Sequence, residues 1–148
     1  MRRICVFCGS STGRDPLHAQ TARAMGEALA ERNLGLVYGG GGIGLMGIVA
    51  DTVLSAGGEV VGVIPEALMQ REIGHLEVTE LRVVNSMHER KQVMADLSDG
   101  VAALSGGLGT LEELLETLTW AQLGIHFKPC GLVNTAGYFD SLLELLDH

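Results

Sequence analysis

The sequence predicts one α/β domain with a mostly parallel sheet and helices on both faces, and two observations carry this prediction. Short apolar runs alternate with amphipathic stretches along all 148 residues, which is the pattern of βαβ units. The 21 glycines are about twice the usual share of roughly 7%. They gather in Gly39–Gly47 and Gly106–Gly109, not in a linker. We therefore expect residues 1–148 to form one nucleotide-binding domain, a Rossmann-like three-layer sandwich.

The expected elements follow the apolar pattern from the first residues to the last. Asp15 and Pro16 are a favourable helix start, an N-cap followed by proline at the first position, and Asn33–Gly35 is a favourable stop. The expected strands are Ile4–Cys8, Leu36–Tyr38, Val60–Ile64, Leu81–Val84, Val101–Leu104 and Gly131–Val133. The expected helices are Pro16–Arg32, Leu45–Ala56, Met87–Leu97, Leu111–Leu123 and Tyr138–Asp147.

Charge and hydropathy argue against several classes of partner. The net charge is −8 and the chain has only two lysines, Lys91 and Lys128, whereas a nucleic-acid binder usually shows a basic stripe. No apolar run approaches the ~18 residues of a membrane span, and the run after Arg2-Arg3 is too short for a signal peptide. We expect a cytoplasmic protein, with a small anionic ligand still possible at a helix N-terminus.

The cysteines and histidines predict neither a disulfide nor a metal site. Cys5 and Cys8 lie in one expected strand, where three residues span about 10 Å, beyond the roughly 7 Å that a disulfide allows. A reducing compartment follows from this interpretation. The five histidines show no ligand spacing with one another or with the cysteines.

The first glycine cluster, Gly39–Gly47, contains G-x-G-x-x-G twice. A dinucleotide site would want an acidic residue at the end of the next strand, roughly 20 residues on. Glu59 precedes that strand and Glu66 follows Pro65, so neither fits. A tight turn that lets the helix pack against the sheet and a direct phosphate contact are equally supported.

The second glycine cluster, Ser105–Glu113, runs from an expected strand into a helix. Free N–H groups and the positive end of the helix dipole would then face one point, which suits a monophosphate. The Lys-Ser/Thr ending of a P-loop is missing, which argues against triphosphate chemistry. Thr110-x-x-Glu113 is also the pattern of a capping box, and spacing alone slightly favours the cap.

Arg90 lies in the middle of an apolar helix stripe. At about 100° per residue it shares the direction of Val93, Met94 and Leu97. A buried arginine needs an internal carboxylate or a bound anion, so we expect Arg90 to be functional. Lys91 lies on a flank of the stripe, and its role stays open; Ser86-x-x-Glu89 is a plausible capping box for the same helix.

These motifs together resemble the Lonely Guy family of cytokinin riboside 5′-monophosphate phosphoribohydrolases. That family carries an Arg-Lys pair at a helix start and the motif P-G-G-x-G-T-x-x-E, which match Arg90-Lys91 and Ser105–Glu113 here. The likeness extends to Val6–Ser11, Val37–Gly41, Ser86–Lys91, Thr119–Gly124 and Lys128-Pro129.

The resemblance implies hydrolysis of the N-glycosidic bond of AMP or an N6-prenylated AMP, with no cofactor, in a homodimer. It implies Arg90 and Glu113 as catalytic residues. It places around the nucleotide Glu72, Lys91, Gly106, Gly107, Leu108, Gly109, Thr110 and Thr119. Two departures are notable: Ser105 replaces the leading proline, which frees φ there, and family members usually continue with a further strand and helix.

Two rival functions remain to be weighed. A non-catalytic nucleotide-binding module on the same scaffold is the alternative that Ser105 favours. A pyridoxal-phosphate lysine decarboxylase needs a Schiff-base lysine with an acidic partner for the pyridinium nitrogen, and neither Lys91 nor Lys128 has such a setting. The preferred base stays open, as does the role of Glu113, which could stabilise charge on the ribose or orient water.

The expected helix Leu111–Leu123 also predicts the dimer contact. Its core side should hold Leu111, Leu114, Leu115, Leu118 and Ala121. Glu113, Glu116 and Trp120 fall on the opposite side, and a tryptophan facing water indicates an interface. The alternative is that a loop of the same chain covers Trp120.

Overall fold

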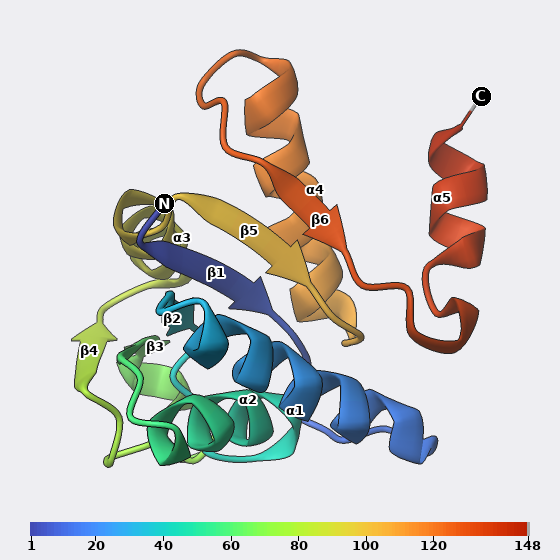
Figure 1. Cartoon of the computed structure of the whole chain (residues 1–148). Helices are drawn as coiled ribbons and strands as arrows, with labels where there is room; N and C mark the ends of the chain where they lie inside the picture. Colours follow the sequence, from blue (N-terminus) through green and yellow to red (C-terminus); the bar gives the residue numbers. More distant parts are fainter. Residues whose placement is uncertain (148) are drawn as a thin grey trace.

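The fold is a parallel sheet between two layers of helices (Figure 1). The computed structural model describes residues 1–147, within which the sheet has six strands in the order β4-β3-β2-β1-β5-β6. Every neighbouring pair is parallel. The expected Rossmann-like sandwich is therefore confirmed.

The observed elements follow the predicted ones closely. The strands are β1 Arg3–Phe7, β2 Gly35–Tyr38, β3 Val60–Pro65, β4 Glu80–Val84, β5 Gly100–Ala103 and β6 Cys130–Leu132. The helices are α1 Pro16–Glu31, α2 Gly44–Ser55, α3 Met87–Leu97, α4 Leu108–Gln122 and α5 Asp140–Leu146, with short 3₁₀ turns η1 Glu66–Leu68 and η2 Thr135–Gly137. The largest difference among the helix starts is at α4, which begins three residues before the expected Leu111.

The hydrophobic core is divided by the sheet into two clusters. One cluster contains buried residues of α1 and α2, such as Leu29 and Val49, and the other contains Met94 of α3 and Leu114 of α4. Cys8, the residue after β1, belongs to the first cluster, whereas Cys5 within β1 belongs to the second. Both thiols are free and buried.

The topology brings three loops together at the carboxyl edge of the sheet. β1 lies between β2 and β5, so the segments that follow these three strands are neighbours. Backbone hydrogen bonds join them: Gly9 N donates to the Ser105 carbonyl at 3.0 Å, and Met46 N donates to the Gly9 carbonyl at 3.2 Å. This edge is where a ligand site is expected. Over the same residues 1–147, no helix combines the length and apolarity needed to cross a bilayer.

The glycines after β2 serve tight turns and close packing. Gly44 has φ +62°, and a Cβ there would lie 2.2 Å from the Ser10 carbonyl carbon. A Cβ on Gly42 would lie 2.6 Å from the Ile73 carbonyl oxygen. Of the two interpretations left open by the sequence, the structure therefore supports close packing for this cluster.

Candidate functional site

A cavity of about 350 Å³ opens at the carboxyl edge of the sheet. Its walls come from the segment after β1, from Gly39, from the loop between β3 and β4, from α3 and from the start of α4. The volume is at the lower end of the range for small-molecule sites. The cavity therefore lies where parallel-sheet folds bind ligands.

Most of the residues expected at the site line this cavity. They are Glu72, Arg90, Gly107, Leu108, Gly109, Thr110 and Glu113. Three others do not line it. Gly106 lines a neighbouring cavity instead. Lys91 forms ion pairs with Glu112 and Glu116 of α4. The exposed Thr119 donates its hydroxyl hydrogen to the Leu115 carbonyl at 2.7 Å. Within one chain, Lys91 and Thr119 therefore do not line the cavity.

Arg90 is buried, with 3% of its surface exposed, and its guanidinium has three acceptors. Nε donates to the Val63 carbonyl at 3.0 Å, and Nη2 donates to the Gly39 carbonyl at 2.5 Å and to Glu72 Oε1 at 3.0 Å. The inward direction predicted from the helix stripe is confirmed. The partner that the sequence left open is an internal carboxylate, Glu72.

The capping of α3 fixes the direction in which Arg90 enters the core. The Ser86 hydroxyl accepts from Glu89 N at 3.1 Å, which is the expected N-cap. The Glu89 carboxylate accepts from Asn85 N at 2.9 Å, one residue before the donor of an ideal capping box. The helix start is thus held from both sides, one turn away from the Arg90 side chain.

Glu72 reaches Arg90 because its loop is tied to the first glycine cluster. Gly42 N donates to the Glu72 carbonyl at 3.1 Å, and His75 N donates to the Gly40 carbonyl at 2.9 Å. The His75 ring lies 2.6 Å from the Asp51 carboxylate on α2. No helix or strand period marks this loop in the sequence, so pattern reasoning could not place it; Glu72 came only from the family resemblance.

The start of α4 leaves backbone amides free at the cavity. Gly107 is the N-cap residue and makes no side-chain cap, and the first helical bond runs from Leu111 N to the Gly107 carbonyl at 3.1 Å. The preceding N–H groups lack helical acceptors and lie at the positive end of the helix. Among residues 1–147, and apart from the adjoining backbone, no heavy atom lies within 4 Å of a Cβ built on Gly107 or Gly109.

The capping box expected at Thr110 and Glu113 is wrong. The helix starts at Leu108, so both residues lie inside it and neither can act as the N-cap. Spacing was misleading because the helix begins with Leu108-Gly109, which has no start signal of its own. Glu113 therefore has no capping role, and its carboxyl group lines the cavity.

Glu113 is an ionisable group whose pKa is shifted mainly by burial. Burial raises the pKa of Glu113 to about 7; the positive charge of Arg90 opposes this rise, and the negative charges of Glu112 and Glu72 add to it. A carboxyl group that titrates near neutral pH is suited to acid–base work or to stabilising positive charge on demand. Among the candidate residues, Glu113 is therefore the carboxyl group whose environment suits such a role.

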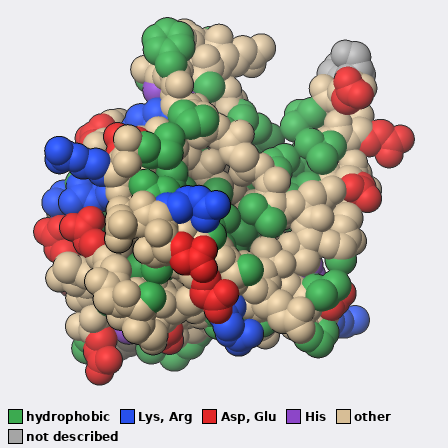
Figure 2. All heavy atoms as spheres, viewed as in Figure 1, with side chains coloured by type: hydrophobic (Ala, Val, Ile, Leu, Met, Phe, Trp, Pro, Cys, Tyr) green, Lys and Arg blue, Asp and Glu red, His purple; other side chains and the backbone are tan. Residues whose placement is uncertain are grey.

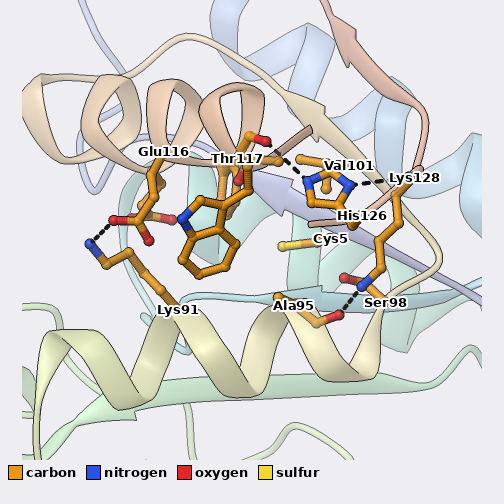
Figure 3. A pocket seen from close by; sticks show the side chains of 12 residues that line it. Cys5, Lys91, Ala95, Ser98, Val101, Glu116, Thr117, His126 and Lys128 are labelled. Carbon is orange, nitrogen blue, oxygen red and sulfur yellow. Dashed lines mark hydrogen bonds and ion pairs between the residues drawn. The ribbon is translucent and has the colours of Figure 1, made fainter. Parts of the chain in front are cut away.

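Lys91 fastens α3 to α4 (Figure 3). Its ammonium group lies 2.5 Å from Glu112 Oε1 and 2.9 Å from Glu116 Oε2, and 9% of its side chain is exposed. The lysine also borders a second cavity of about 30 Å³, behind the first, with Trp120, His126 and Lys128. Glu113 lines both cavities.

The predicted faces of α4 need a correction. Glu113, Glu116 and Trp120 are partly buried, because α3 and the segment around His126 cover the side that was expected to meet water. Leu115, expected in the core, is 39% exposed. An isolated helical pattern cannot tell which of two flanks a neighbouring helix covers. The alternative that the same chain covers Trp120 is the one observed.

Comparison with known proteins agrees with these features. The chain matches the family described as "Possible lysine decarboxylase" over residues 46–148. It is 56% identical over 146 residues to a cytokinin riboside 5′-monophosphate phosphoribohydrolase of Arabidopsis thaliana, covering 99% of this chain and 68% of that protein. This chain belongs to the Lonely Guy family.

Other similarities of this Lonely Guy protein extend the comparison. A probable enzyme of the same name from Oryza sativa is 55% identical over 145 residues, which are 98% of this chain and 65% of that protein. The chain thus spans about two thirds of the length of these curated relatives. The Moco carrier protein from Chlamydomonas reinhardtii has the same fold, with a TM-score of 0.76 at 23% identity, covering 99% of this chain and 84% of that one.

The description "lysine decarboxylase" would imply pyridoxal phosphate, and the residues do not fit it. The lysines are Lys91 and Lys128. Lys91 is paired with two glutamates, and Lys128 Nζ donates to the Ala95 carbonyl (Figure 3). Both border the small cavity, which has room for about one water molecule. Across residues 1–147, no group of three or more His, Cys, Asp and Glu side chains could hold a metal ion.

The raised pKa of Glu113 predicts a pH-dependent stability. Between the unfolded value near 4.3 and the folded value of about 7, the folded state binds more protons than the unfolded state. The free energy of unfolding therefore falls as pH rises, by up to about 4 kcal/mol from this group. Glu113→Gln should lack this loss and become more stable than wild type at pH 8.

Urea denaturation of both proteins at pH 5 and pH 8 measures this effect. The surface variant Glu31→Gln is the control and should follow wild type at both pH values. If the free energy of unfolding falls equally from pH 5 to pH 8 in wild type and Glu113→Gln, the burial of the Glu113 carboxyl group is contradicted.

Proposed function

We propose that this Lonely Guy protein hydrolyses the N-glycosidic bond of AMP or an N6-modified AMP to free base and ribose 5-phosphate. The observation that carries this proposal is one cavity that holds both the free amides of Gly107–Thr110 and the buried carboxyl group of Glu113. The amides suit a 5′-phosphate, and Glu113 lies one helical turn further on. The names of the curated relatives support the same reaction.

The reaction follows from this spacing. A phosphate held at the start of α4 would place the attached ribose over Glu113. As the base leaves with the bonding electrons, positive charge develops on the ribose, and an ionised Glu113 stabilises it or orients the attacking water. Water supplies the hydroxyl group at the sugar carbon and the proton that the departing base takes up.

Arg90 supports this chemistry indirectly, through the two carboxyl groups near it. Its three acceptors leave its guanidinium little freedom to follow a substrate. We infer that Arg90 acts by holding Glu72 at the cavity and by favouring the ionised form of Glu113, since its charge lowers the pKa of Glu113.

We also propose that the working unit is a cytoplasmic homodimer, joined through the exposed face of α4. Leu108, Leu115 and Leu123 share this face with Thr119, and the following segment exposes Ile125 and Phe127. Figure 2 shows hydrophobic side chains on the surface over the outer end of α4 and over α5. A second copy would cover this surface and could bring Thr119 to the partner's cavity. The three free thiols agree with a reducing compartment.

The first test is incubation with AMP and with isopentenyl-AMP, followed by chromatography for the free base. Wild type should release base from at least one of them. Glu113→Gln should bind the nucleotide nearly as well and turn over roughly 10²–10⁴-fold more slowly, with Glu31→Gln as the control. Nucleotide binding by wild type without any release of base would instead support the non-catalytic nucleotide-binding module.

The open space above the second glycine cluster gives a second test. Gly109→Ala should keep or raise thermal stability, because alanine favours a helix over glycine by up to about 1 kcal/mol. Its methyl group would keep a phosphate away from the amides and weaken AMP binding about 10- to 100-fold. Gly131→Ala, equally uncrowded but in β6, should bind AMP like wild type. Equal AMP affinities of wild type, Gly109→Ala and Gly131→Ala would contradict the proposal that this loop binds the phosphate.

The dimer is tested by light scattering at micromolar concentration. Leu123, the 68% exposed C-cap residue of α4, should be essential for the contact, so Leu123→Glu should give a monomer with reduced activity. Leu76→Glu, on the loop before β4 and also exposed, should stay dimeric. A wild-type monomer that still releases base from AMP would contradict the proposal.

A further inference from the structure

Ser105, at the entrance of the second glycine cluster, departs from the Lonely Guy motif. The motif has proline at this position, whereas this chain has Ser105. Proline would fix φ by its ring; serine does not. The serine is nevertheless buried, with 5% of its surface exposed, and its hydroxyl lies 2.8 Å from Nδ1 of His18.

His18 comes from the first turn of α1, whose start is fixed by the sequence. The Asp15 carboxylate accepts from Leu17 N at 2.9 Å, and Pro16 occupies the first helical position. This capped start gives His18 a defined position relative to the sheet. The imidazole therefore reaches the loop after β5 from a rigid element.

A second aromatic residue completes the arrangement. The Tyr138 hydroxyl donates to the Gly106 carbonyl, and the Tyr138 ring meets the His18 ring edge to face with centroids 5.6 Å apart. The segment that carries Tyr138 is fastened to α1 by the hydrogen bond from Thr135 Oγ1 to Thr21 Oγ1 at 2.9 Å. Ser105 and Gly106 are thus each held by a side chain from a different element.

His18 and Tyr138 do not line the cavity that contains Glu113. A cavity of about 360 Å³ with His18 and Tyr138 in its wall shares Gly9, Ser10 and Gly107 with the candidate active-site cavity. Gly9 N also donates to the Ser105 carbonyl at 3.0 Å. The position of Ser105 therefore sets where the amides of Gly107 to Thr110 point.

We propose that His18 is a positioning residue for the phosphate of the substrate. Its hydrogen bond to Ser105, supported by Tyr138, supplies the restraint that proline supplies in the family motif. The inference rests on the proposed function, in that the loop binds the 5′-phosphate of a nucleotide. His18 touches neither the phosphate nor the reacting bond.

The experiment compares AMP with adenosine, which lacks the phosphate, by calorimetry and steady-state kinetics. His18→Ala and Ser105→Ala should each weaken AMP binding and raise KM about 3- to 10-fold, the effect of one hydrogen bond. Adenosine affinity and kcat should stay within about twofold of wild type. The double variant should be no worse than either single variant, because both changes remove the same interaction.

Two rescue variants and one control separate positioning from general stability. His18→Asn offers an amide at the place of Nδ1 and should restore AMP affinity. Ser105→Pro in the His18→Ala background should also recover it, because the ring restrains φ without a hydrogen bond. Gln20→Ala, on the exposed side of α1, should behave like wild type. Equal losses for AMP and adenosine, additive losses in the double variant, or no recovery with either rescue would overturn the proposal.

Amide hydrogen exchange distinguishes this inference from the proposed function. In the protein without ligand, residues 105–110 should exchange faster in His18→Ala than in wild type. If these amides exchange faster in His18→Ala but wild type neither binds nor cleaves AMP, His18 restrains the loop and the proposed function is wrong. Unchanged exchange and unchanged AMP affinity in His18→Ala, in a protein that cleaves AMP, would overturn the role of His18 alone.

Discussion

The buried guanidinium of Arg90 is the constraint on which the rest of the site depends. A desolvated charge is costly unless it is paired and hydrogen-bonded, and Arg90 donates to two carbonyls and one carboxylate. Gly39 must be glycine for this arrangement, because a Cβ there would lie 2.3 Å from Nη2. The loop after β3 must bring Glu72 to the cavity. Two segments that look unrelated in the sequence are therefore fixed by one side chain.

The same arrangement explains why Glu113 keeps a raised pKa beside a cation. An arginine paired directly with Glu113 would favour its ionised form strongly. Here Glu72 is the carboxylate in the ion pair, at 3.0 Å from Nη2. Its negative charge raises the pKa of Glu113 while Arg90 lowers it, and burial decides the balance. The division of labour between two carboxylates gives one structural group and one group that titrates near neutral pH.

The sheet, the helices and the direction of Arg90 could be predicted because each follows from a local period. The apolar runs and the stripe around Arg90 are properties of a few consecutive residues. The covered side of α4 could not be predicted, since it depends on Lys91 of α3 and on the segment around His126. The start of α4 was misplaced for a related reason: Thr110 and Glu113 carry the spacing of a cap but lie inside the helix.

Composition also could not separate the two glycine clusters, which the structure shows to differ in kind. After β2, added Cβ atoms would collide with backbone, so glycine there is required by the fold. At Gly107 and Gly109 the space is open in the described chain, residues 1–147, and φ is not in the left-handed region. Neither packing nor backbone strain then requires glycine at these two positions. What remains is access to the amides, so the cluster that lacks the G-x-G-x-x-G pattern is the one whose geometry suits a ligand.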